Sequence, residues 1–376
     1  MKPIGLYIHI PFCVKKCAYC DFNSFVPADE DQVKAYLRAL AEDIKNSGFN
    51  KQRYLVKSIY FGGGTPSLIK PEYIVRILDE IRSNFDASSA REVTIEVNPE
   101  SISLEKLFAY KKNGIDRISM GVQSFEDINL KILGRAHDAK DVLIAINLIK
   151  EAGFKKTSID LIYGLPGQTL KDWENDLEKF LNAGISHISF YDLKIEEGTP
   201  FYSIKNKLEV PDNDLQSKMY KLGCSKLLKS GFSHYEISSF AQSAQESVHN
   251  SIYWSNEEYI GFGAGAYSYF EGRRFSRAKS IDKYIQQAIA GEFRKYEQEK
   301  LEARDRLVET MILNLRLMKG FSLKNVEEKA GISADTDLLS SLNELENQKL
   351  ILSSRGKYRL SKKGILYYDT IASELL

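Results

Sequence analysis

The stretch Pro11-Phe12-Cys13-Val14-Lys15-Lys16-Cys17-Ala18-Tyr19-Cys20 carries three of the chain's four cysteines, at the spacing Cys-x3-Cys-x2-Cys. It directly follows an apolar run, residues 5–10, which is typical of a β-strand. Cysteine thiolates hold iron–sulfur clusters, and a four-iron cluster with only three protein ligands has one iron open to another molecule. The motif therefore predicts a [4Fe-4S] cluster with one vacant coordination position.

Two other uses of these cysteines need to be weighed. A structural zinc site normally has four ligands, and the nearest candidate for a fourth, His9, lies in the expected strand. A disulfide framework fits poorly, because the motif holds an odd number of cysteines and the remaining one, Cys224, is far along the chain. The cluster is the favoured interpretation.

Composition limits the broad class of protein. With 376 residues the chain is long enough for two domains, and 52 basic side chains nearly balance 51 acidic ones, so nucleic acid is an improbable partner. The N-terminus lacks a signal-peptide pattern, and the longest aliphatic stretches, such as residues 142–149, are too short to span a bilayer. Four cysteines suit a reducing compartment. We expect a soluble cytoplasmic protein, with a peripheral position at a membrane as an open alternative.

Apolar runs alternate with helical patterns over the first two thirds of the chain, which predicts an α/β fold of six parallel β/α units. Such a set forms an incomplete barrel or an open sheet. The expected strands are residues 5–10, 56–61, 92–97, 116–120, 157–162 and 187–192, and the expected helices include 31–46, 71–84, 104–113, 139–152 and 170–182.

The pattern changes after residue 239. Residues 242–256 are polar and 261–266 are small and expected to be flexible, and a mainly helical region with a hairpin at 350–360 begins at residue 299. We expect a core (1–240), a connecting segment (241–298) and a smaller, winged-helix-like C-terminal domain (299–376). The hairpin is basic, through Arg355, Lys357, Arg359, Lys362 and Lys363, but most such modules within enzymes serve packing or partner binding rather than DNA binding.

Polar residues follow several of the expected strands. Gly62-Gly63-Gly64-Thr65 follows the second expected strand, and glycines there let the backbone approach a ligand closely. Glu96, Gln123 and Asp160 lie at the ends of later strands, and Arg135 could clamp a carboxylate. These groups suit a cleft for a polar small molecule that carries ribose hydroxyls, an ammonium group and a carboxylate.

Together these motifs resemble the radical S-adenosylmethionine (SAM) superfamily. Residues 98–100, 121–125 and 160–169 narrow the resemblance to its coproporphyrinogen III dehydrogenase-like branch. It implies a partial (β/α)6 barrel, a [4Fe-4S] cluster on Cys13, Cys17 and Cys20, and SAM on the fourth iron, cleaved by one electron from a reductant. The matching SAM-pocket positions are Tyr7, Tyr19, Gly64, Thr65, Glu96, Gln123, Arg135 and Asp160.

Three features indicate which kind of protein within this branch the chain resembles. Phe22 stands where the oxidase has a further cysteine, and only a dozen residues precede Cys13, where the oxidase has a longer extension. His249-Asn250-Ser251-Ile252-Tyr253-Trp254 matches the His-Asn-x-x-Tyr-Trp motif of the HemW family of heme chaperones. That resemblance implies a heme site including His249 and transfer of heme to an acceptor protein, for which a respiratory, membrane-associated heme protein is one candidate. A hydrogen-bonded structural histidine is the alternative for His249.

Two further hypotheses of function stay open. The first is an enzyme that decarboxylates coproporphyrinogen III without oxygen, and the second is a regulator that reads DNA through its C-terminal hairpin. Cys224 could be a heme ligand or attachment point, but a buried small apolar side chain is the favoured interpretation.

Overall fold

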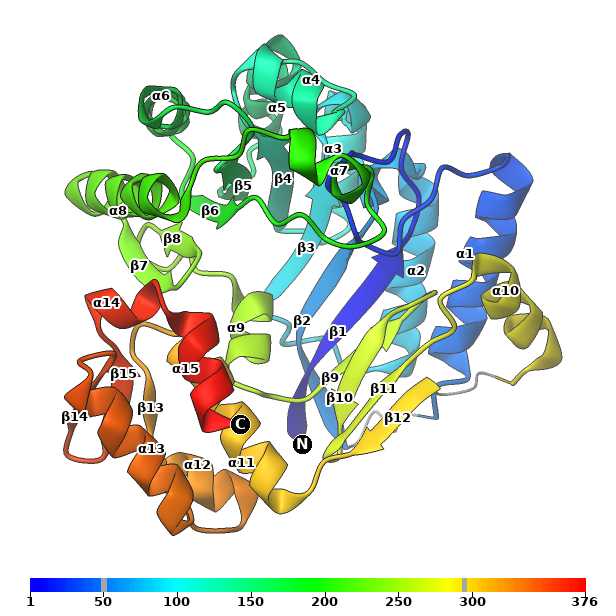
Figure 1. The fold of residues 1–376 in the computed structure, drawn as a ribbon. Coiled ribbons are helices and arrows are strands. Elements are labelled where there is room, and N and C mark those ends of the chain that lie inside the picture. Colours follow the sequence, from blue (N-terminus) through cyan, green and yellow to red (C-terminus); the bar gives the residue numbers. More distant parts are fainter. Residues whose placement is uncertain (49–52, 293–295) are drawn as a thin grey trace.

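The computed structural model describes residues 1–48, 53–292 and 296–376. Six parallel strands form the centre of a twelve-stranded sheet (Figure 1). They lie side by side in the same order as in the sequence. The expected α/β fold with six β/α units is thereby confirmed. The strands are β1 (Lys2–Ile10), β2 (Tyr54–Gly63), β3 (Glu92–Val97), β4 (Arg117–Gln123), β5 (Lys156–Tyr163) and β6 (His187–Asp192).

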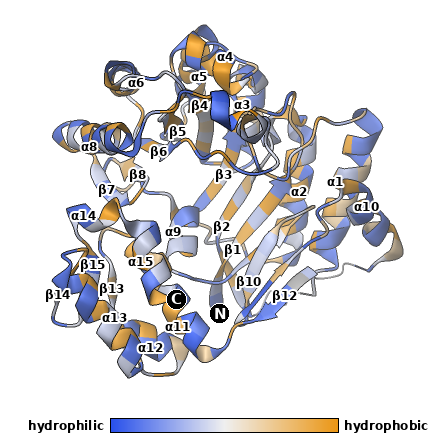
Figure 2. Cartoon of the chain, viewed as in Figure 1, coloured by the Kyte–Doolittle hydropathy of each residue, from blue (hydrophilic) through white to orange (hydrophobic). Residues whose placement is uncertain are grey.

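These strands are buried on both faces, and for this reason their sequences are nearly continuous apolar runs. In β4, for example, Ile118, Met120 and Val122 are fully buried, and Ser119 between them is also covered. Figure 2 shows the central strands as largely hydrophobic, whereas most of the surrounding helices mix both colours. Burying the apolar side chains of such strands is the main favourable contribution to folding.

Helices cover the outer side of the curved sheet (Figure 1), and successive helices pack side by side. Several stop at a glycine, as expected: Gly114 (φ 90°) follows α3 and Gly153 (φ 76°) follows α5, in a conformation that favours glycine. Within the described residues, none of the helices combines the length and apolar character needed to cross a bilayer. The helices are α1 (Glu30–Lys45), α2 (Pro71–Asn84), α3 (Leu104–Lys112), α4 (Asp127–Leu133), α5 (Ala139–Glu151), α6 (Leu170–Asn182), α7 (Pro200–Ser203) and α8 (Asn213–Lys229).

The segment after residue 240 continues the main sheet rather than merely connecting two parts. β9 (Tyr259–Phe262) pairs in parallel with β1, so Gly261 and Phe262, expected to be flexible, are buried in a strand next to the centre of the sheet. The sheet then extends through further strands, and α10 packs on α1. The remaining elements of this region are β7 (Ser233–Glu236), β8 (Ser239–Ala241), α9 (Val248–Trp254), β10 (Tyr267–Phe270), β11 (Arg273–Ser276), α10 (Ile281–Ala290) and β12 (Tyr296–Lys300).

The C-terminal region has its own apolar cluster, which includes Leu307, Met311, Leu342 and Ile351. The expected hairpin is present as β14 and β15, and a short strand, β13, completes a separate three-stranded sheet. Helices and a basic hairpin agree with the predicted winged-helix-like end. The elements are α11 (Ala303–Leu315), β13 (Phe321–Ser322), α12 (Leu323–Ala330), α13 (Thr336–Asn347), β14 (Ile351–Ser354), β15 (Lys357–Leu360), α14 (Lys362–Ile365) and α15 (Tyr368–Leu375).

Candidate functional site

The three clustered cysteines lie on a loop that follows β1 at the carboxyl end of the sheet. The backbone N–H of Cys13 donates to the carbonyl of Phe25 (2.9 Å), which closes the loop on itself. Cys13, Cys17 and Cys20 line one cavity of about 130 Å³, and burial raises the pKa of the Cys13 and Cys20 thiols. The donor set is therefore three sulfur atoms around one cavity, which suits an iron–sulfur cluster.

The glycine-rich turn after β2 packs tightly against this loop. The Gly64 N–H donates to the carbonyl of Ile10 (2.8 Å), and a Cβ on Gly64 would lie 2.7 Å from the carbonyl oxygen of Phe12. At Gly62 a Cβ would lie 3.0 Å from the carboxylate of Glu96. These glycines are thus needed because side chains would push the cysteine loop and Glu96 away from the sheet.

Arg135 joins the cysteine loop to the strand ends. Its guanidinium donates to the carbonyl of Gly121 and to the side-chain oxygen of Asn98, both at 2.7 Å, and its Nη1 lies 3.5 Å from the sulfur of Cys17. Its Nε is buried and lacks a hydrogen-bond partner among the described residues. This N–H is thereby left for an acceptor other than the described residues of the chain.

Two half-buried carboxyl groups lie in the same region. Glu96 accepts from the hydroxyl of Tyr60 (2.7 Å) and from the Gly63 N–H (3.0 Å), and burial raises its pKa. Burial and the nearby charge of Glu96 raise the pKa of Asp160 to about 7. Because two carboxylates are held close together away from water, a cationic ligand would be favoured between them.

The structure brings together most of the residues expected to bind SAM. Tyr7 differs, since it lines a neighbouring cavity of about 180 Å³ together with Glu96, and its hydroxyl contacts the His9 ring (3.0 Å). The others line the cavity of the three cysteines, namely Tyr19, Gly64, Thr65, Glu96, Gln123, Arg135 and Asp160.

The cysteine cavity adjoins an interior cavity of about 400 Å³, which Glu96, Gln123 and Asp160 of the expected cleft also line. The two share Tyr19, Cys20, Glu96 and Asp160, and the larger one reaches Arg117 at the opposite, N-terminal end of β4. Ser119 and Tyr191 also line it. These residues occur within apolar strands, where a single polar side chain gives no distinctive pattern.

His249 is the second residue of α9, and its ring packs against β2, apart from both cavities. The ring is fully buried, its Nδ1 contacts the hydroxyl of Ser58 and its Nε2 contacts the hydroxyl of Tyr253, each at 2.8 Å. Burial lowers its pKa to about 3, so the imidazole is neutral. Both ring nitrogens are occupied, and the contacts of His249 are those of the structural alternative.

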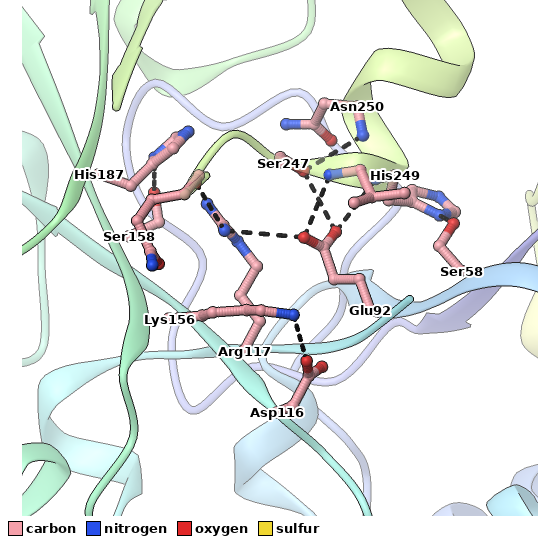
Figure 3. A network of polar contacts seen from close by, with 12 residues as sticks. Ser58, Glu92, Asp116, Arg117, Lys156, Ser158, His187, Ser247, His249 and Asn250 are labelled. Carbon is pink, nitrogen blue, oxygen red and sulfur yellow. Dashed lines mark hydrogen bonds and ion pairs between the residues drawn. The ribbon is translucent and has the colours of Figure 1, made fainter. Parts of the chain in front are cut away.

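A buried carboxylate, that of Glu92 at the start of β3, holds the N-terminus of α9 (Figure 3). It accepts from the backbone N–H groups of Val248 (3.1 Å) and His249 (3.0 Å) and pairs with Arg117 at 3.6 Å. Arg117 in turn donates to the carbonyl of Gln245 (3.0 Å). This network closes the end of the barrel opposite the cysteines and fixes the direction of α9.

A wide groove of about 760 Å³ opens beside the cysteine loop. The groove is lined by Phe22 and Phe25 on the side of the loop, and by Tyr253 and Trp254 on the side of α9. Phe22, the residue that departs from the oxidase pattern, also lines the interior cavity and the cysteine cavity. The loop with the cysteines thus borders two separate spaces, one inside the barrel and one outside.

Replacing Glu92 with alanine would leave the Arg117 guanidinium buried without its counter-charge and the N-terminus of α9 without an acceptor. We expect Glu92→Ala to lower the free energy of unfolding by about 3–5 kcal/mol, measured by urea denaturation. The control is Glu257→Ala, which breaks a partly exposed ion pair with Lys57 (2.8 Å) next to the same helix and should cost below about 1 kcal/mol. Equal losses in the two variants would contradict this role of Glu92.

The raised pKa of Asp160 predicts a dependence of stability on pH. In the unfolded chain this carboxyl ionises near its ordinary value of about 4, whereas in the folded protein it stays protonated up to about pH 7. The folded state is therefore favoured at low pH, and that contribution is lost as the pH rises through this window. Asp160→Asn should become progressively more stable than the unmodified, cluster-free protein between about pH 4 and 7. A stability difference that stays constant across the window would contradict the shift.

Comparisons with known proteins agree with this geometry. Residues 7–180 match the family described as the radical SAM superfamily, and residues 301–367 match the HemN C-terminal domain. The heme chaperone HemW of Bacillus subtilis is 38% identical over 373 residues, which cover 98% of each chain. The mitochondrial radical S-adenosyl methionine domain-containing protein 1 of Danio rerio is 32% identical over 99% of this chain and 86% of its own.

The solved structure of coproporphyrinogen III oxidase (HemN) from Escherichia coli, a radical SAM enzyme, has a TM-score of 0.86 at 25% identity. It matches over 100% of this chain and 90% of that one. The overall fold of the two proteins is thus the same, including the C-terminal region. Because proteins named heme chaperone HemW are similar to this chain over nearly their whole length, the chain belongs to the HemW family of the radical SAM superfamily.

Proposed function

We propose that this protein is a heme chaperone, which binds heme and passes it to an acceptor protein on a scaffold that also holds a [4Fe-4S] cluster and SAM. The similarity to proteins named heme chaperones over nearly the full chain supports this function. The structural observation that carries it is the groove beside the cysteine loop, because two residues of the His-Asn-x-x-Tyr-Trp motif, Tyr253 and Trp254, line it.

In this proposal Cys13, Cys17 and Cys20 hold the cluster, and SAM occupies the adjoining cavity. Glu96 and Asp160 provide negative charge for the cationic part of SAM, and the unpaired Nε of Arg135 is a donor for its carboxylate. When bound, the cluster and SAM supply one-electron chemistry. An electron donor and the heme acceptor are the remaining partners of the proposal, and the acceptor is a respiratory heme protein at the membrane.

The second candidate is the oxidative decarboxylation of coproporphyrinogen III. The fold match to the oxidase favours it. Phe22 in place of the oxidase cysteine weighs against it. The third, a DNA-reading regulator, has only the basic hairpin in its favour.

Cys17→Ser should prevent assembly of a complete cluster. Anaerobic reconstitution of the unmodified protein with iron and sulfide should give about four irons per chain and a broad visible absorbance, both reduced in the variant. Cys224→Ser is the matched control, because Cys224 lies on α8, where burial raises the pKa of its thiol to about 11. A full complement of iron in Cys17→Ser would refute the ligand assignment.

A paired anaerobic experiment separates the first two functions. The reconstituted protein is loaded with heme and mixed with the heme-free form of a respiratory heme protein, whose recovered absorbance reports transfer. In parallel the protein receives SAM, a strong reductant and coproporphyrinogen III. We expect transfer of heme and no repeated turnover to protoporphyrinogen. Many turnovers without heme binding would establish the enzyme instead.

A further inference from the structure

Hydrogen-bond donors of the chain point at the sulfur atoms of two of the three clustered cysteines. The Thr65 hydroxyl donates to the Cys13 sulfur at 3.6 Å, within range for the larger sulfur atom. The Arg135 guanidinium donates to the Cys17 sulfur at 3.5 Å. Thr65 is 2% exposed, so its hydroxyl is shielded from competing water. Hydrogen bonds to the sulfur ligands of an iron–sulfur cluster are among the factors that set its reduction potential.

Asn98 joins these two donors through the two ends of its side-chain amide. Its Oδ1 accepts from Arg135 Nη2 (2.7 Å), and its Nδ2 donates to Thr65 Oγ1 (3.0 Å). Asn98 directly follows β3 and is the N-cap of a short 3-10 helix, η2 (Pro99–Ser101), with which it forms a capping box. The cap holds the amide between Thr65 and Arg135, at the wall of the cysteine cavity.

The partners of Asn98 determine how its amide and the Thr65 hydroxyl are oriented. The Arg135 guanidinium and the backbone N–H of Ser101 can only donate, so the amide oxygen of Asn98 faces them. The amide nitrogen then faces Thr65, whose oxygen accepts, and the hydroxyl hydrogen of Thr65 is left for Cys13. These contacts form one directed chain from Asn98 through Thr65 to Cys13. The same amide steadies Arg135.

We propose, resting on the cluster ligands proposed above, that Asn98 is a positioning residue for the cluster. By aligning the donors of Thr65 and Arg135 on two of the sulfur ligands, it raises the reduction potential of the cluster. A donor to a thiolate sulfur stabilises the reduced cluster more than the oxidised one, because the reduced cluster carries one more negative charge. Thr65 and Arg135 thus do more than line the SAM cavity, since together with Asn98 they set how readily the cluster accepts an electron from its reductant.

Removing the Thr65 hydroxyl tests the direct contact. Thr65→Val keeps the shape of the side chain and loses the donor. At a fixed applied potential the ratio of reduced to oxidised cluster should fall about tenfold, a shift of about 59 mV to more negative potential for a one-electron couple. The measurement is a redox titration of the reconstituted full chain, followed by electron paramagnetic resonance of the reduced cluster. SAM is left out, so that the loss of a contact with SAM cannot contribute.

Two further variants are controls for this titration. Thr65→Ser keeps the hydroxyl, and its ratio of reduced to oxidised cluster should stay within about twofold of that of the unmodified protein. Thr157→Val makes the same substitution at a buried position of β5, where the hydroxyl has no hydrogen-bond partner among the described residues. It should leave the potential unchanged.

A double-mutant cycle tests the role of Asn98. In Asn98→Asp the carboxylate keeps the contact with Arg135 and the helix cap, but it cannot donate to Thr65. The Thr65 hydroxyl then turns from Cys13 to the carboxylate. Asn98→Asp should therefore lower the potential more in the unmodified background than in a Thr65→Val background, where only the added charge acts. An equal shift in the two backgrounds would overturn the role of Asn98.

The outcomes distinguish the role of these donors from the cluster ligands on which it rests. If the unmodified protein assembles no four-iron cluster, the ligand assignment and the role of the donors fail together. If the cluster assembles and Thr65→Val leaves its potential unchanged, the ligands stand and only the role of the donors is overturned. The titration reports a ratio of reduced to oxidised cluster, so it stays readable in a variant that assembles fewer clusters.

Discussion

The buried carboxylate of Glu92 is the contact on which the arrangement of the interior cavity and the outer groove depends. It holds the N-terminus of α9 against the start of β3 and pairs with Arg117 inside the barrel. Through α9 it sets the positions of Tyr253 and Trp254 on the outer groove, while through Arg117 it shapes the end of the interior cavity. The side chains of Glu92 and Arg117 are each less than 3% exposed, so their ion pair carries a desolvation cost. In return it fixes both the N-terminus of α9 and the end of the interior cavity.

Much of the fold was predictable from the sequence, because strands buried on both faces read as apolar runs and the helices between them carry clear stop signals. The strands after residue 240 were missed for a physical reason. β9 contains Gly261 and lies beside β1 only through a contact between residues more than 200 positions apart, so no local pattern marks it. Most of the SAM-pocket positions were brought together as expected, whereas Tyr7 faces a neighbouring cavity. For His249 the motif identified an important position, but only the contacts of both ring nitrogens show that it lies behind the groove.

The two spaces differ in electrostatics in a way that suits two different ligands. The interior holds Glu96 and Asp160, whose raised pKa values reflect carboxyl groups kept from water, and a cation entering there would favour their ionised forms. The outer groove is bordered mainly by cationic side chains and lined by aromatic rings. Phe22 lines both spaces, so its ring contributes an apolar surface to each of them.

The position of β1 in the middle of the sheet has a consequence for synthesis of the chain. One edge of β1 pairs with β2 soon after both have emerged from the ribosome, but its other edge pairs with β9, which is made almost 200 residues later. At about 5–20 residues per second that delay is roughly 10–40 s. During this interval an apolar strand next to the cysteine loop presents unpaired backbone groups, the feature through which nascent chains associate wrongly. Until β9 is made, this edge of β1 therefore lacks the strand that covers it in the folded sheet.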